Sequence, residues 1–367
     1  MYTVEMLKAL GTHTNLELFL LCSPDFEWQQ IPGTRTLPVL QRLSHPIPVL
    51  RKARFVTAQW VNPFRILRTA EKKGIEVVHL QSFHHLSFAQ WKVAASRSSV
   101  KWVISAHDIK RDVAIFHKNW EDEQLRASYQ FADAILVHSN FQKEELVGFA
   151  HVDPLKVHLV PHGPYVYAQP ADSKESIRLK LGIPQSVDVA LFFGQVRNDK
   201  NLSSFLRALS IAKMNTHLIV AGQPGGHHQD AAYYRALCEE LQLEERVHFF
   251  FGHVPDERVG QYFTAADWIA LPYRQSFTSQ SGVLNIAAQF NRPVLVSSAP
   301  VLKETVLAGG IGYACLGDGV EELKQGIVAM QEVKVKVQRK NFDQYRKEYS
   351  WKRSAELCVE LYEKLVS

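Results

Sequence analysis

DVALFFGQVRNDKNLSSFLRALSIAKMNTHLIVAG, residues 188–222, contains the pattern that decides the fold class. The apolar runs at 188–194 and 216–222 predict two buried strands, and the segment between them has helical spacing. A strand, a helix and a second strand in this order form a unit whose two strands lie parallel. The stretch therefore predicts a parallel sheet with crossover helices.

The same alternation continues in both directions along the chain. Strands are predicted at 16–22, 76–82, 101–107 and 133–139, and again at 247–252, 267–273, 292–298 and 312–316. A polar stretch with Pro170 and Pro184 separates the two series, and the pattern is helical from 319 onward. We expect two doubly wound α/β domains, at 1–165 and 166–345, and a C-terminal helix at 346–367 that could cross back to the first domain. The chain begins in a helical pattern, so the usual first strand is either missing or replaced by another element.

Composition limits the classes of protein to consider. The 367 residues are 46% apolar and 22% charged, which is typical of a soluble globular protein. The four cysteines are scattered, which argues against a disulfide framework or a zinc site and fits a reducing compartment. No apolar run reaches the roughly 18–20 residues of a membrane span, and the first residues lack a signal-peptide layout. We predict a cytoplasmic protein.

The positive charge is concentrated in residues 28–105. This region has twelve Lys or Arg residues and two acids, and aromatic side chains such as Trp60 and Phe64 alternate with the cations. Such a face could lie on an anionic membrane surface, as a peripheral protein does, or bind a phosphorylated acceptor. The plain alternative is a solvated helix face. Nucleic acid is not expected as a partner, because no nucleic-acid-binding motif accompanies the charge.

Two loops carry the residues that point to chemistry. The strand at 188–194 ends in Gly194, and the loop after it carries Arg197 and Lys200, which can offset phosphate charge. A hydroxyl-rich loop at 276–281 leads into a helix near Ser281–Gly282, whose free N–H groups and dipole favour an anion. Both loops follow strands of one parallel sheet, so they predict a metal-free diphosphate site. Taken singly, each loop could also be an ordinary connection with solvated cations.

The order of the motifs resembles the family-4 retaining glycosyltransferases of the GT-B fold. The matching stretches are FFGQVRNDKN (192–201), VHFFFGHVPDERVGQYFTAADWIALPYR (247–274), SGVLNIAAQFNRPVLVSSAPVLKETV (281–306), ISAHDI (104–109), AILVHSNFQKEEL (134–146) and VHLVPHG (157–163). The resemblance implies two Rossmann-like domains that face each other across a cleft. The first would bind a glycan or lipid-linked acceptor, and the second would bind a nucleotide-sugar donor. The sugar would move with retained configuration, without metal or other cofactor.

The resemblance also implies roles for particular residues. Lys200 would hold the leaving diphosphate, with Arg197 as the substitute for an arginine that the family places directly after Gly194. His107 matches the family's histidine close to the transferred sugar. The remaining donor-binding positions implied by the resemblance are Gly194, Gln195, Ser279, Gln280, Ser281, Gly282, Val283, Asn285 and Glu304.

The sequence departs from the family pattern at two positions. The family usually has two glutamates eight residues apart, and here those positions are Ser279 and Ala287. Some exopolysaccharide-type members similarly read Q-S-G at this loop, and Asn285 is a candidate for a weaker contact. The departure leaves the donor open. It also keeps two alternatives open, a non-catalytic glycosyltransferase-like partner subunit and a nucleotide-sugar epimerase.

Overall fold

The computed structural model describes residues 2–28, 30–81, 84, 87–96, 98–110, 117–225 and 228–367. The chain forms two compact units. Unit 1 consists of Met1–His162 and Trp351–Ser367, and unit 2 of Gly163–Ser350. The limits expected from the sequence, 165 and 345, differ slightly from these divisions. The C-terminal segment returns to unit 1, so unit 2 is an insertion between two parts of unit 1.

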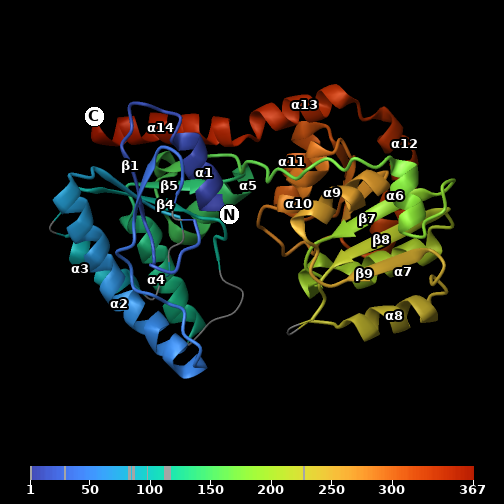
Figure 1. The fold of residues 1–367 in the computed structure, drawn as a ribbon, viewed down its shortest axis with the longest axis horizontal. Coiled ribbons are helices and arrows are strands. Elements are labelled where there is room, and N and C mark those ends of the chain that lie inside the picture. Colours follow the sequence, from blue (N-terminus) through green and yellow to red (C-terminus); the bar gives the residue numbers. More distant parts are fainter. Residues whose placement is uncertain are drawn as a thin grey trace. The chain divides into compact units, whose positions relative to one another are not determined.

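Unit 1 contains a four-stranded parallel sheet in the order β3-β4-β5-β6 (Figure 1). Its strands are β3 (Val77–Leu80), β4 (Lys101–Ser105), β5 (Ala134–Val137) and β6 (Val157–Leu159). Its helices are α1 (Tyr2–Leu10), α2 (Pro48–Lys73), α3 (Phe88–Ala95), α4 (Lys118–Phe131), α5 (Asn140–Ala150), the 3₁₀ turn η2 (Pro154–Lys156) and α14 (Trp351–Val366).

The strand predicted at 16–22 lies outside this sheet. It forms β1 (Leu18–Leu21), which pairs in parallel with β2 (Thr34–Leu37) in a separate two-stranded sheet. The sequence analysis did not predict β2, because TRTL is short and polar and has no apolar alternation. The end of the strand predicted at 76–82 includes Ser82, which lies outside the described residues.

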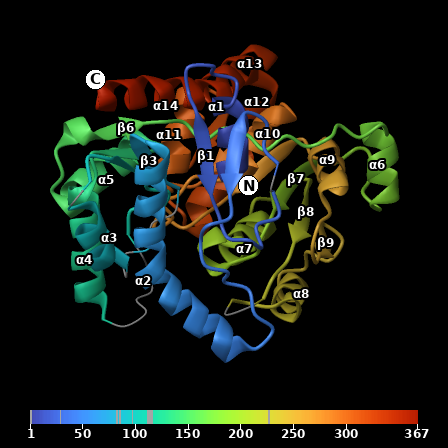
Figure 2. The ribbon, with the colours of Figure 1, turned by 60° about the vertical axis from the view of Figure 1, so that its left-hand side comes forward.

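The helices of unit 1 cover its sheet through three apolar clusters. α4 and α5 pack with Ile104, Ile135 and Val157, while α1 and α14 pack on alternate residues of the same strands. Both α1 and α14 lie side by side in Figures 1 and 2, and their Met6 and Cys358 share one cluster. α2 and α3 bury Trp91 against Trp102. This alternation of buried residues follows from the two-residue period of a strand.

Unit 2 contains a six-stranded parallel sheet in the order β12-β11-β10-β7-β8-β9. Its strands are β7 (Asp188–Phe193), β8 (Thr216–Gly222), β9 (Val247–Phe251), β10 (Trp268–Leu271), β11 (Val294–Val296) and β12 (Gly312–Ala314). Its helices are α6 (Lys174–Lys180), the 3₁₀ turn η3 (Asn198–Lys200), α7 (Leu202–Ile211), α8 (Ala231–Glu240), α9 (Asp256–Ala265), α10 (Gly282–Gln289), α11 (Pro300–Gly309), α12 (Val320–Lys336) and α13 (Arg339–Glu348).

Helices cover both faces of the sheet in unit 2. Val189 and Leu191 of β7 face one cluster with α9, α10 and α11, and Ala190 and Phe192 face the other with α7, α8 and α12. These strands are buried on both faces, which explains their continuous apolar runs. The doubly wound architecture and the C-terminal helices predicted from the sequence are confirmed for this part of the chain.

The strand order of unit 2 reverses between β7 and β10. From β7 the chain runs outward through β8 and β9, then returns to the other side of β7 with β10, β11 and β12. At such a switch point, the connections after the two central strands leave toward opposite faces of the sheet. The opening between these connections is where open parallel sheets bind ligands. A ligand site is therefore expected at the segments after Phe193 and after Leu271.

Candidate functional site

The loops after β7 and β10 lie together at the switch point. Gly194 directly follows β7, and a Cβ atom built on it would lie 3.7 Å from Cγ2 of Val283 in α10. Its φ of +99° favours glycine, since other side chains rarely adopt that conformation. Gly222 at the end of β8 packs even closer, because a Cβ there would lie 1.7 Å from the Gly194 carbonyl oxygen. The ends of β7 and β8 therefore approach each other more closely than a residue with a Cβ at 222 would allow.

Lys200 at the end of η3 reaches the loop after β10. Its Nζ lies 3.5 Å from the centroid of the Tyr273 ring and 4.1 Å from that of Phe277. The Tyr273 hydroxyl in turn lies 3.2 Å from Oγ of Ser281, the residue before α10. The Tyr273 side chain thus connects Lys200 to the residue before α10. The backbone N–H of Arg274 also donates to the Asp199 carbonyl at 2.8 Å, which ties the two loops together.

The surroundings of Lys200 weaken its hold on a proton. Burial lowers the pKa of Lys200 to about 7, against the raising effect of Asp199, and Arg197 lowers it further. The aromatic faces compensate part of the lost hydration of the ammonium group through cation–π attraction. A bound anion would restore the ordinary preference for the charged form, because opposite charge nearby raises the pKa of a lysine. The site is therefore suited to gain charge when an anion arrives.

Arg197 lies in the same loop. One terminal nitrogen of its guanidinium lies 2.9 Å from Oδ2 of Asp199, and within the described residues its Nε is buried with no hydrogen-bond partner. This N–H is therefore a donor that a bound anion could satisfy. Since Asp199 neutralises only part of the guanidinium, Arg197 can add a second cation beside Lys200.

The start of α10 completes the group. The helix begins at Gly282 with no acidic residue in its first turn, and the Ser281 side chain does not cap it. Ser281 is buried and its hydroxyl contacts Tyr273 instead. Ser279, Gln280 and Ser281 precede the helix in the connection from β10. The first N–H groups and the dipole of α10 therefore add positive potential to the site.

The structure separates other predicted residues from this group. Asn285 is buried, and its Oδ1 accepts a 2.6 Å hydrogen bond from the Tyr345 hydroxyl of α13. Glu304 lies on α11 close enough to Tyr349 to raise the pKa of that phenol, whose burial has the larger effect. Ala287, one of the positions where the resemblance implies an acid, is fully buried in the core. Gln195 is exposed beside the site.

His107 lies in unit 1, two residues after β4 at the carboxyl edge of that sheet. Its Nδ1 is 2.9 Å from Nε2 of His138, which directly follows β5, and the two rings stack with centroids 5.0 Å apart. Tyr2 of α1 packs edge-on against His107, with ring centroids 4.6 Å apart. Burial lowers the pKa of His107, although Asp108 and a backbone hydrogen bond with Gln81 raise it.

Sequence reasoning missed Tyr273, Phe277 and His138. Tyr273 and His138 lie at the ends of the strands predicted at 267–273 and 133–139, and that position near a carboxyl edge was the available signal. Phe277 had no such signal, because only the path of the loop places its ring against Lys200.

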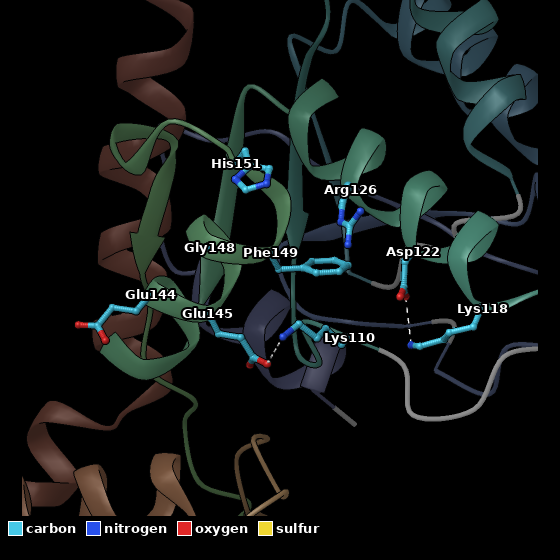
Figure 3. A pocket seen from close by; sticks show the side chains of 9 residues that line it. All are labelled: Lys110, Lys118, Asp122, Arg126, Glu144, Glu145, Gly148, Phe149 and His151. Atoms are coloured by element: carbon cyan, nitrogen blue, oxygen red, sulfur yellow. Dashed lines mark ion pairs between the residues drawn. The ribbon is translucent and has the colours of Figure 1, made fainter.

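Two hollows lie elsewhere in the units. One, of about 610 Å³, lies between α4 and α5 in unit 1 (Figure 3). Its charges are paired with one another, Lys110 with Glu145 at 3.2 Å and Lys118 with Asp122 at 3.1 Å, so it has no excess of either sign. The other, of about 460 Å³ in unit 2, borders the site on the side of Asp199.

Two further findings concern metal ions and membranes. Among residues 2–28, 30–81, 84, 87–96, 98–110, 117–225 and 228–367, no group of three or more His, Cys, Asp or Glu side chains has the arrangement of a metal site. No helix in those ranges combines the length and the apolar character needed to cross a membrane.

Comparison with known families gives two adjacent matches. The family described as Glycosyltransferase Family 4 matches residues 7–164, and Glycosyl transferases group 1 matches residues 173–349. The second match contains the whole switch-point site. The protein is a glycosyltransferase with the GT-B fold.

Individual relatives are distant. The D-inositol 3-phosphate glycosyltransferase of Corynebacterium jeikeium (strain K411) is 25% identical over 356 residues, covering 91% of this chain and 83% of the relative. That of Corynebacterium glutamicum (strain R) is 26% identical over 243 residues, covering 63% of this chain and only 57% of the relative.

Solved structures share the fold of this glycosyltransferase over its whole length. Sucrose-phosphate synthase from Thermosynechococcus elongatus has a TM-score of 0.73 at 20% identity, covering 100% of this chain and 92% of its own. Anabaena HepE in complex with UDP has a TM-score of 0.74 at 15% identity, covering 98% and 96%. At these identities the likeness concerns the fold.

Proposed function

We propose that the protein transfers a sugar from a nucleoside diphosphate donor to a glycan or lipid-linked acceptor, with retention of configuration and without a metal ion. The observation that carries the proposal is the convergence of Lys200, Arg197 and the start of α10 at the switch point of unit 2. HepE has been solved with UDP and with UDP-glucose, and this favours a uridine nucleotide as the first donor to test.

The chemistry proposed for this site is electrostatic. When the bond between sugar and diphosphate breaks, negative charge grows on the leaving phosphate oxygen. Lys200, Arg197 and the N–H groups of α10 are held in place before the reaction, so they stabilise that charge without reorganisation. Three sources of positive potential replace the divalent ion that other transferases use. The resemblance assigns His107 to the transferred sugar.

The acceptor side of the proposal involves α2. Val49, Val56, Trp60 and Phe64 are all exposed and recur at helical spacing on this 26-residue helix, which is visible along its length in Figure 2. Exposed Arg51, Lys52, Arg65 and Arg68 lie beside them. An apolar stripe bordered by cations fits the interface of an anionic membrane. We propose that α2 binds such a surface, where a lipid-linked acceptor would be available. Arg97, one of the cations of the 28–105 region, lies outside the described residues.

Replacing Lys200 with methionine tests the diphosphate site. The change keeps the apolar stem and removes the ammonium, so affinity for UDP should fall about 10-fold to 100-fold, as for other lost charge-assisted hydrogen bonds. Turnover should fall at least as much. Lys336→Met is the matched control, because Lys336 is an exposed lysine of the same unit. UDP affinity that is equal in both variants, measured by titration calorimetry, would contradict the site.

A second function is favoured by the residues at 279 and 287. Both positions lack the acid that the resemblance implies, and Ala287 is buried where a carboxylate would not fit without rearrangement. These facts agree with a partner subunit that binds a nucleotide without catalysis. UDP binding with neither transfer nor hydrolysis across a panel of nucleotide-sugars and acceptors would favour this function.

A further inference from the structure

Two histidines at the carboxyl edge of the sheet in unit 1, His107 and His138, form a hydrogen bond whose donor and acceptor can be assigned. Nδ1 of His138 lies 2.8 Å from the Val160 carbonyl oxygen, and Nε2 of His138 lies 2.9 Å from Nδ1 of His107. Buried Gln142 holds the two backbones together. Its side-chain oxygen accepts from the His138 N–H at 2.9 Å, and its amide donates to the His107 carbonyl at 3.0 Å.

The direction of these hydrogen bonds follows from the first acceptor. A carbonyl oxygen only accepts, so Nδ1 of His138 must carry the proton. In a neutral imidazole the other nitrogen then has a lone pair, so Nε2 of His138 accepts. His107 therefore donates from Nδ1, and in its neutral form its Nε2 has the lone pair. The backbone of Val160 thus sets the tautomer of His107 through His138.

Burial keeps both rings neutral. It lowers the pKa of His138 to about 3 and lowers that of His107. The other titratable groups around the pair are Tyr2 of α1, His79 of β3, Asp108 and His162. The backbone hydrogen bond with Gln81 competes, because it favours a proton on the nitrogen of His107 that does not face His138. Only the imidazolium form of His107 could donate to both Gln81 and His138, and burial disfavours that form.

We propose that His138 is a positioning residue that holds neutral His107 with its proton on Nδ1, so that Nε2 accepts a hydrogen bond from a hydroxyl group of the transferred sugar. The role of His107 toward the sugar rests on the proposed function, whereas the tautomer does not. The assignment agrees with a ring that has two nitrogens at 138, because such a ring can accept from His107 and donate to Val160 at once.

Nitrogen NMR of the ¹⁵N-histidine-labelled full chain, without substrate, tests the tautomer directly. His107→Phe and His138→Phe assign the signals. The proposal expects wild-type His107 to show a protonated Nδ1 and a bare Nε2 near pH 7, and His138 to show the same. His107 with its proton on Nε2, or as imidazolium, would overturn it. This reading needs only the wild-type fold and no activity.

The His138→Phe variant tests the consequence. Phenylalanine keeps the stacked ring but removes both nitrogens, so the proton of His107 should shift to Nε2, facing Gln81. Donor turnover should fall about 10-fold, as for a lost hydrogen bond to the sugar. His217→Phe is the control, because it breaks the similar His217–His248 contact of 3.1 Å in unit 2. Unchanged His107 signals in a folded His138→Phe protein would overturn the positioning role. A correct tautomer in a protein without transferase activity would instead count against the proposed function.

Discussion

At the scale of single residues, Lys200 combines packing against aromatic rings with the ability to bind an anion. Its ammonium lies against Tyr273 and Phe277, and its pKa is lowered to about 7. Lys200 is therefore only partly charged near pH 7. A bound diphosphate gains the full attraction to the ammonium group only when Lys200 takes up a proton.

Proton uptake on binding follows from this packing. UDP should raise the pKa of Lys200, so at pH 8 binding should take up a substantial fraction of one proton. At pH 6 uptake should be small, because Lys200 is already charged in the free protein. Titration calorimetry in buffers with different heats of ionisation measures this number. Binding heats that do not depend on the buffer at pH 8 would contradict a lowered lysine pKa, and Lys200→Met should abolish the pH 8 uptake.

The residues that sequence reasoning identified are those next to strand ends. Gly194, Lys200 and Ser281 follow from the rule that the carboxyl edge of a parallel sheet carries the site. The aromatic packing around Lys200 did not follow, because it depends on the path of a loop. Asn285 was expected to contact a ligand. In the structure its Oδ1 accepts a hydrogen bond from the hydroxyl of Tyr345, which lies 60 residues further along the chain. Partners so distant in sequence leave no local pattern.

At the scale of elements, Ala287 shows what the core of unit 2 excludes. It lies fully buried on α10, packed in the cluster beneath β7 and β10. At this position, where the resemblance implies an acid, the side chain makes apolar contacts instead.

Restoring the acid at 287 should destabilise the protein. Ala287→Glu places a carboxyl group in the core, at a cost of about 3 kcal/mol or more once it is ionised. Burial raises the pKa of such a group above its unfolded value, so the folded state binds more protons and stability falls as pH rises. Urea unfolding should show a deficit against Ala287→Gln that is larger at pH 8 than at pH 5. An equal deficit at both values would mean that the carboxylate reaches water.

Membrane binding belongs to helix α2. Wild-type protein should co-sediment with vesicles of phosphatidylcholine and phosphatidylglycerol at low salt and be released by salt, which screens the cations. Trp60→Ser and Phe64→Ser together should weaken binding about 10-fold or more, because they remove two exposed aromatic side chains. Leu179→Ser is the control, since Leu179 is 77% exposed on α6 of unit 2. Equal sedimentation of all variants would leave α2 an ordinary solvated face.

The elements themselves could be predicted where burial is strong on both faces. The strands of unit 2 were predicted because they are continuous apolar runs, as parallel strands covered by helices require. β2 was missed because half-exposed Thr and Arg side chains give no such run. The strand predicted at 16–22 forms β1, which pairs with β2 outside the four-stranded sheet.

At the scale of the whole molecule, each unit has its own core, and α14 belongs to the core of unit 1. Leu361 of α14 packs with Met6, Leu10 and Leu136, whereas Leu302 of α11 packs within unit 2.

Core truncations should therefore separate the units. Leu361→Ala should destabilise unit 1 by about 2–4 kcal/mol and raise hydrogen exchange in α1 and β5. Leu302→Ala should do the same in β7 and β10 and weaken UDP binding. Hydrogen exchange with mass spectrometry reads both variants, and exchange that rises throughout the chain in either one would show a single cooperative core.

Because unit 2 is an insertion, unit 1 is completed only after unit 2 has been synthesised. A ribosome makes Gly163–Ser350 before α14, so unit 2 can fold while α1 and the sheet of unit 1 still lack the helix that packs on them. Until that helix emerges, the apolar side chains around Met6 are open to chaperones or to neighbouring nascent chains. Completion of the core of unit 1 thus depends on a helix that is synthesised after unit 2.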